Sequence, residues 1–150
     1  MNHDPQTPLW PTLDLTVPAR AEQLEMVREQ VESFLFTELG DRFGGFPMDE
    51  VMLAVQEAIA NVVRHAYPSD QVPGPLGMHV EVADSQISFT VRDCGTGYDP
   101  FCVLGPSHDQ PTPGGYGLFL IQSIMSRVEY RSVDKLNELV MIKLLEPVGA

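Results

Sequence analysis

Basic residues are scarce in this sequence. The 150 residues include nine Lys and Arg against 21 Asp and Glu, which gives a formal net charge of −12. A chain this acidic repels the phosphates of nucleic acids and of anionic lipids. We therefore expect no direct binding to nucleic acid or to a membrane, while a basic protein partner stays open.

Cysteine is also rare, and long apolar runs are absent. Cys94 and Cys102 are the only two cysteines. A disulfide between them is conceivable, but so few cysteines in a chain this size are more often reduced thiols, which favours the cytoplasm. The first 15 residues show no cationic start followed by an apolar run, and no apolar run reaches the roughly 18 residues of a membrane-spanning helix. We expect neither a signal peptide nor a transmembrane segment.

Several standard motifs are missing. The sequence contains no G-x-x-x-x-G-K-[ST], which excludes a P-loop nucleotide site, and no G-x-S-x-G, which argues against an α/β-hydrolase nucleophile. The spacings of its histidines and cysteines match no zinc pattern. A catalytic or binding site in this protein would therefore use residues outside these three standard motifs.

The apolar pattern predicts five strands and three helices. Strands are expected at 13–17, 78–82, 87–91, 128–133 and 139–145, and helices at 19–39, 48–67 and 118–126, with turns at 84–86 and 135–138. Short hairpin links favour an α/β (α+β) two-layer sandwich, in which a mixed, mostly antiparallel sheet of four or five strands carries three helices on one face. We expect residues 1–12 to form a flexible tail and residues 13–150 a single domain.

The helix predicted at 48–67 carries the strongest functional signal. Pro47 and Pro68 bound it, and its apolar stripe consists of Val51, Val55, Ala58, Ile59, Val62 and Ala66. Glu57 and Asn61 lie one turn apart on another side of this helix. An Asn oxygen suits Mg²⁺, and a Glu one turn away can orient or deprotonate a hydroxyl. On its own, however, the pair also fits an ordinary solvated polar face.

Two glycine-rich segments lie downstream. Asp93-Cys94-Gly95-Thr96-Gly97 follows a strand, where glycines allow a ligand close to the backbone and an acid can accept a hydrogen bond from an adenine amine. Gly114-Gly115-Tyr116-Gly117 precedes the helix predicted at 118–126, and helix N-termini favour phosphate. A plain turn and a flexible hinge are the alternatives for the two segments. The proline-rich stretch 98–113 between them is long enough to be a lid.

Three segments in this order carry a family resemblance: E-A-I-A-N-V-V-R-H-A-Y, D-C-G-T-G-Y-D and G-G-Y-G-L-F-L-I. Together they resemble the Bergerat-fold (GHKL) ATPases, which include gyrase and the histidine kinases. Within that group the chain is most similar to the small bacterial anti-sigma-factor serine/threonine kinases. The resemblance spans roughly residues 13–145.

The resemblance implies an ATP-binding kinase with Mg²⁺. Asn61 would hold the Mg²⁺ that bridges the ATP phosphates, Glu57 would act as the catalytic residue on the attacking hydroxyl, and Asp93 would bind the adenine amine. The glycines would line the base and let the lid close; they are Gly95, Gly97, Gly115 and Gly117. The substrate would be an anti-sigma-factor antagonist, the second partner a sigma factor or similar regulator, and a homodimer is a candidate state.

Two departures from the family favour an alternative. Residues 98–114 contain no Lys or Arg, although phosphoryl transfer relies on cations. Asn137-Glu138 also stand where the family often has Gly-Thr before its last strand. The alternative is a nucleotide-binding or nucleotide-free protein-interaction switch without kinase activity. His65 matches the family pattern but is assigned no chemistry.

Overall fold

A single five-stranded sheet forms one layer of the protein. The computed structural model describes residues 10–95 and 113–146. The strands are β1 (Thr12–Pro18), β2 (Pro75–Val82), β3 (Gln86–Asp93), β4 (Arg127–Val133) and β5 (Leu136–Leu144), in the order β1-β2-β3-β5-β4. All four pairings are antiparallel. The expected sheet of four or five mostly antiparallel strands is confirmed, but it is not mixed, because the described strands form no parallel pair.

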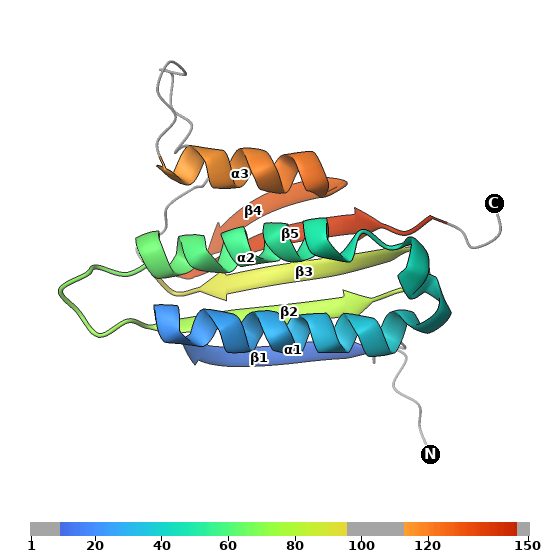
Figure 1. The fold of residues 1–150 in the computed structure, drawn as a ribbon. Helices are drawn as coiled ribbons and strands as arrows, with labels where there is room; N and C mark the ends of the chain where they lie inside the picture. The colour runs from blue at the N-terminus through green and yellow to red at the C-terminus, as the bar shows by residue number, and fades with distance from the viewer. Residues whose placement is uncertain (1–9, 96–112, 147–150) are drawn as a thin grey trace.

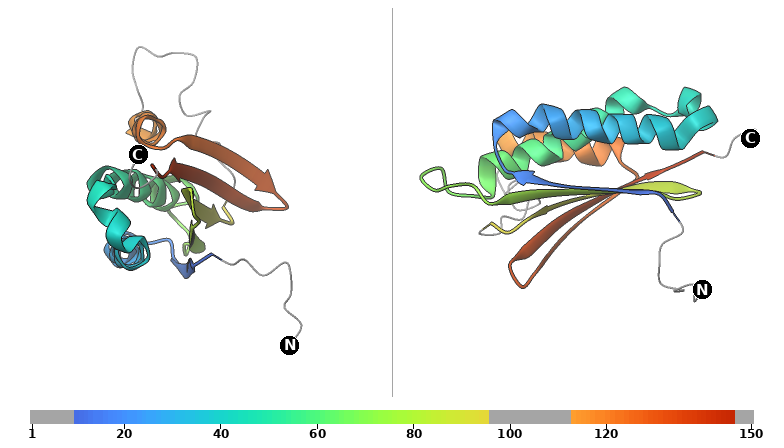
Figure 2. Two further views of the ribbon diagram at one scale, coloured as in Figure 1. Left: turned by 90° about the vertical axis from the view of Figure 1, so that its right-hand side faces the viewer. Right: turned by 90° about the horizontal axis from the view of Figure 1, so that it is seen from below.

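Three α-helices form the second layer. They are α1 (Ala21–Leu39), α2 (Met48–His65) and α3 (Pro113–Ile124), and the short 3-10 helix η1 (Gly40–Gly45) follows α1. Figure 2 shows all three helices on one face of the sheet, while no described helix covers the other face. The two-layer arrangement with helices on one face is therefore as expected.

The core lies between the two layers. The apolar stripe predicted on α2 is buried in full, from Val51 to Ala66. It packs toward sheet residues that alternate along each strand, such as Phe89 and Val91 on β3. Because strand side chains alternate between faces, the same strands present polar residues to the uncovered face. Burial of this apolar surface is the main source of stability.

Three predicted boundaries are wrong in detail. The α1 helix begins at Ala21, not at residue 19, because Pro18 and the extended Arg20 delay it. The α2 helix ends at His65, so Tyr67 lies outside it. Gly114, Gly115 and Gly117 lie within the first turns of α3, not before it, because Pro113 is compatible with the first helical position.

The expected turn at 135–138 is also wrong. Val133 pairs with Leu136, so the loop of the β4–β5 hairpin is only Asp134-Lys135. Both residues have positive φ, 51° and 68°. A two-residue hairpin loop requires this backbone to match the twist of the strands. Asn137 and Glu138 consequently belong to β5.

The fold brings several motif segments to one end. Figure 1 shows the C-terminal ends of α2 and β3, the N-terminal end of α3 and the β4–β5 turn on the same side of the molecule. The expected tail lies largely outside the described residues, and so do Gly97, Cys102 and nearly all of the expected lid. No helix in the described ranges is long and apolar enough to cross a membrane.

Gly substitution in the β4–β5 turn should stabilise the protein. Lys135→Gly removes the Cβ strain of a left-handed residue, and we expect an increase of about 0.5–1 kcal/mol in the free energy of unfolding. Urea denaturation would show a higher midpoint at an unchanged slope. Ser85→Gly, in the β2–β3 turn without positive φ, is the control and should lower the midpoint; equal shifts would contradict this interpretation.

Candidate functional site

Three polar side chains lie in a row along α2, on the side of the helix away from its apolar stripe. The Arg64 Nη2 donates a hydrogen bond of 2.7 Å to the Asn61 Oδ1 and lies 3.5 Å from the Glu57 Oε2. Asn61 is only 3% exposed, whereas the Glu57 and Arg64 side chains are 29% and 44% exposed. The row, here called the α2 polar row, thus has a buried centre and ends that reach solvent.

The α3 helix packs on this row through a glycine. A Cβ placed on Gly117 would lie 2.9 Å from the Glu57 Oε2 and 3.4 Å from the Asn61 Nδ2. The backbone of Gly117 therefore sits directly against both side chains, at a distance that only glycine permits without displacement. The predicted association of Glu57 and Asn61 with the glycine segment is present in the structure at this position.

The second part of the site is a hydrogen-bond network around Asp93. Asp93 is 5% exposed, and its Oδ1 accepts hydrogen bonds from the Gly95 backbone N–H (2.9 Å) and the Asn137 Nδ2 (2.8 Å). The Asn137 Oδ1 in turn accepts a hydrogen bond from the Ser132 hydroxyl (2.6 Å). We call these four residues the Asp93 network. Since each buried polar group has a partner, the carboxylate can be buried here at a tolerable cost.

Backbone packing joins the Asp93 network to α2. A Cβ on Gly95 would lie 1.9 Å from the Ala66 carbonyl oxygen and 2.6 Å from its carbon. The turn after β3 thus touches the backbone at the C-terminal end of α2. The same helix carries the polar row and contacts the Asp93 turn, so α2 links the two parts of the candidate site.

Tyr67 connects the strands beside this turn. Its hydroxyl donates to the Pro75 carbonyl oxygen (2.6 Å) and accepts from the Cys94 N–H (2.8 Å). Partial burial raises the pKa of Tyr67, an effect that the Cys94 hydrogen bond opposes and the nearby Asp93 charge supports. The hydroxyl therefore stays protonated at neutral pH and can serve as this donor.

The structure brings some of the predicted site residues together and leaves others apart or outside the described residues. Glu57, Asn61 and Gly117 lie together, and Asp93 and Gly95 lie together. Gly115 lies in the first turn of α3, and Gly97 is outside the described residues. His65 is exposed, and partial burial together with the Arg64 charge lowers its pKa, so it is neutral at pH 7. Cys94 is a free, exposed thiol.

Sequence reasoning missed four site residues: Arg64, Tyr67, Asn137 and Ser132. A signal for Arg64 was available, because positions 57, 61 and 64 follow the four- and three-residue steps of one helix face. The sequence pattern places Asn137 in a turn, where, as a departure from the family, it only weakens the case for efficient transfer. Only the strand register, which pairs Asn137 with Asp93 and with Ser132, shows its contact.

The donor set on α2 suits a hard cation with few protein ligands. The Asn61 Oδ1 and the Glu57 carboxylate are oxygen donors of the kind that Mg²⁺ prefers. Within the described ranges, no three His, Cys, Asp or Glu residues gather as metal ligands. A Mg²⁺ ion here would need phosphate and water oxygens to complete its coordination.

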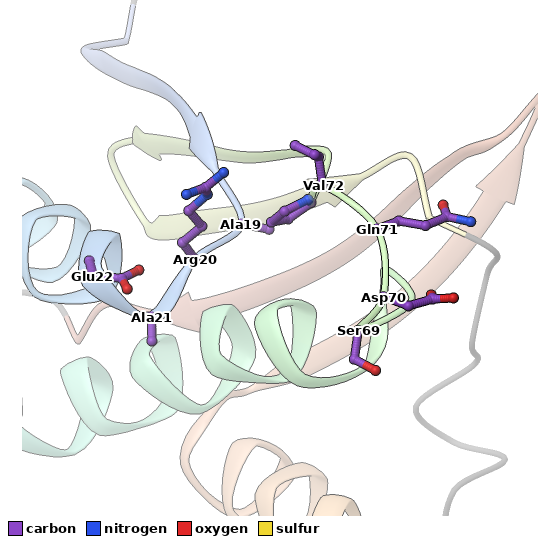
Figure 3. Close-up of a pocket in the computed structure, with 9 residues that line it drawn as sticks. Ala19, Arg20, Ala21, Glu22, Ser69, Asp70, Gln71 and Val72 are labelled. Carbon is purple, nitrogen blue, oxygen red and sulfur yellow. The ribbon is translucent and has the colours of Figure 1, made fainter.

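A separate pocket lies elsewhere. It has a volume of about 570 Å³ and is formed by residues 19–22 at the start of α1 and residues 69–73 after α2 (Figure 3). None of the predicted site residues lines it, and its labelled side chains, such as Arg20 and Gln71, point in different directions. It lacks convergent polar groups, so we do not assign the site to it.

Comparison with known proteins identifies the family. Residues 17–143 match the family model of the histidine kinase-like ATPase domain, and the chain belongs to this family. It is 31% identical to the serine-protein kinase RsbW of Staphylococcus epidermidis, over 77% of this chain and 76% of that protein, and 30% identical to RsbW of Staphylococcus aureus over the same shares. The resemblance to small bacterial serine kinases is confirmed.

Solved structures support the fold. The histidine kinase domain of the Erythrobacter litoralis EL346 blue-light activated kinase superposes with a TM-score of 0.52 at 17% identity, covering 86% of this chain. The chain spans 62% of that structure's length. The Acinetobacter baumannii histidine kinase AdeS gives 0.51 at 13% identity, covering 90% of this chain and 68% of that structure. The expected Bergerat ATP-binding fold is confirmed.

Gly95→Ala should separate the Asp93 turn from α2. A methyl group would overlap the Ala66 backbone, which cannot give way as a flexible side chain can. We expect a loss of roughly 1–3 kcal/mol in the free energy of unfolding, measured by urea denaturation. Gly45→Ala, where no atom lies within 4 Å of the added Cβ, is the control. A stable Gly95→Ala protein would show that this contact is not tight.

Proposed function

We propose that this protein is an ATP-dependent serine/threonine protein kinase that works in the cytoplasm as an anti-sigma regulatory factor. Its substrate would be an anti-sigma-factor antagonist, and its second partner a sigma factor or similar regulator. The observation that carries the proposal is the convergence of Glu57, Asn61 and the Gly117 backbone on one side of α2. The similarity to serine-protein kinases supports the kinase over a switch without activity.

The α2 polar row would bind the phosphates and orient the substrate. Mg²⁺, when bound, would offset the phosphate charge. Asn61 would hold this ion through Oδ1, while Glu57 would accept a hydrogen bond from the attacking serine hydroxyl and take its proton. Gly117 would let the first turns of α3 approach closely, so that backbone N–H groups face the phosphates.

Arg64 supplies a cation that the expected lid lacks. Residues 98–114 contain no Lys or Arg, but the Arg64 guanidinium lies within hydrogen-bond distance of the Asn61 Oδ1 and near Glu57. Phosphoryl transfer requires positive charge near the transferring group. The Arg64 side chain is 44% exposed and can move from the Asn61 oxygen to a phosphate. This position supports efficient transfer despite the acidic composition.

The Asp93 network would bind the base. A buried carboxylate that already accepts two hydrogen bonds at Oδ1 can accept a further one from an exocyclic amine. Adenine carries such an amine. ATP is therefore the nucleotide that this end of the site would select.

The proposal of these protein partners rests on the family resemblance alone. A net charge of −12 is compatible with basic partner surfaces, since opposite charge speeds association. The family resemblance is also the reason why a homodimer is part of the proposal.

Kinase activity is tested with Mg·ATP and a candidate antagonist. We expect phosphoserine on the antagonist, and Glu57→Gln should reduce the transfer rate about 10²–10⁴-fold, because the proton acceptor is lost while ATP still binds. Glu50→Gln, an exposed residue in the first turn of the same helix, is the matched control. Bound ATP without any label transfer by the unaltered protein would favour the switch without kinase activity.

The role of Arg64 is tested by two substitutions. Arg64→Ala should lower the rate constant of transfer about tenfold or more, and Arg64→Lys should restore part of it, because lysine keeps the charge but not the planar donor geometry. Single-turnover kinetics with Mg·ATP measure this effect. Arg28→Ala, which breaks an ion pair with Glu32 on α1, is the control. An unchanged rate in Arg64→Ala would exclude Arg64 from transfer.

A further inference from the structure

The ends of three strands meet at Asp93. Asp93 is the last residue of β3, and Asn137, on the adjacent strand β5, is its partner in register. Ser132 on β4 is in turn the register partner of Asn137. Hydrogen bonds of 2.6 Å and 2.8 Å connect Ser132 to Asn137 and Asn137 to Asp93. The chain of contacts thus runs across the sheet into the proposed base site.

The direction of these hydrogen bonds is fixed by the two acceptors beside Asn137, the Asp93 carboxylate and the Gly95 carbonyl oxygen. A carboxamide has one donor end and one acceptor end. Neither of these groups can donate, so the Nδ2 end of Asn137 faces them, at 2.8 Å and 3.4 Å, and the Oδ1 end accepts from the Ser132 hydroxyl. With the amide reversed, its oxygen would face these two acceptors. These two acceptors therefore disfavour that arrangement, and the Ser132 hydroxyl, which can donate or accept, holds the amide at its oxygen end.

Both donors to Asp93 converge on the same oxygen. The Asn137 Nδ2 and the Gly95 N–H each bond to Oδ1, and among the described residues none donates a hydrogen bond to Oδ2. A carboxylate held by one oxygen has a defined orientation, and its second oxygen remains an acceptor. Such an oxygen accepts from a 6-amino group and repels a 6-oxo group.

The position of Glu138 shows why Asn137 is the residue that donates a hydrogen bond to Asp93. Glu138 stands next to it on β5 but faces the opposite side of the sheet, where its Oε2 lies 3.6 Å from the Arg92 Nε. The Gly-Thr expected from the family at this place is absent. Of the two replacement residues, only Asn137, which is 2% exposed, touches Asp93.

We propose that Asn137 and Ser132 are positioning residues that orient the Asp93 carboxylate and thereby set the preference for a 6-aminopurine nucleotide. The proposal rests on the proposed ATP-binding function and adds to it the residues that determine base specificity. Asn137 acts through Asp93, and Ser132 acts through Asn137.

Two nucleotides that differ in one group test the proposal. Titration calorimetry would compare ATP with purine ribonucleoside triphosphate, which lacks the 6-amino group. Asn137→Leu keeps the side-chain shape but removes the donor, so we expect about tenfold weaker ATP binding and less than a twofold change for the analogue. Ser132→Ala should weaken ATP binding by about two- to fivefold. Glu138→Gln, on the other face of the sheet, is the control.

Each outcome decides the question. A fall in the ratio of ATP to analogue affinity in both variants supports the proposal. Parallel losses for the two nucleotides would show a merely structural role and overturn it, as would unchanged ATP affinity. If Asn137→Leu does not fold, Ser132→Ala, an exposed residue, carries the test alone. Failure of the unaltered protein to bind ATP would overturn the proposed function as well.

Discussion

Buried polar groups without partners are costly, and this constraint shapes both parts of the site. Asn61 and Asp93 are 3% and 5% exposed, and leaving either unsatisfied would cost about 1–3 kcal/mol or more. Arg64 serves Asn61, while Asn137 and the Gly95 N–H serve Asp93. In each case the oxygen is held in place by the protein before any ligand arrives. A preorganised acceptor such as the Asp93 carboxylate needs little rearrangement on binding, whereas Arg64 would have to leave the Asn61 oxygen before that oxygen could hold a metal ion.

The sequence allowed the helices and strands to be predicted because burial leaves a periodic pattern. The α2 stripe and the alternation on β2 and β3 gave these elements within a few residues. The pairing of Glu57 with Asn61 followed from helical geometry alone. The contacts of Gly95 and Gly117 could not be predicted, since the approach of Gly117 to α2, for example, depends on how two helices pack.

What could not be predicted depends on register and on unusual backbone. Asp134 and Lys135 adopt positive φ, which such residues do rarely, so the tight turn gave no sequence signal. The turn length sets the register of β4 on β5, and that register brings Ser132 to Asn137. A loop one residue longer would shift β4 by one residue along β5 and turn Ser132 to the other face of the sheet, away from Asn137. The Asp93 network is therefore a consequence of tertiary structure that composition and spacing do not contain.

The α2 helix connects the two ends of the site. Glu57 lies near the Gly117 backbone of α3, and Ala66 touches Gly95 beside Asp93. Between Glu57 and Ala66 the helix advances roughly 14 Å at about 1.5 Å per residue. A helix is stiff over this length, so the spacing between the proposed phosphate end and the proposed base end is set by the hydrogen bonds of α2. The glycine contacts then fix how the turn after β3 and the start of α3 meet that helix. One element thus determines the position of both parts of the candidate site, because each packs on its backbone or its polar row.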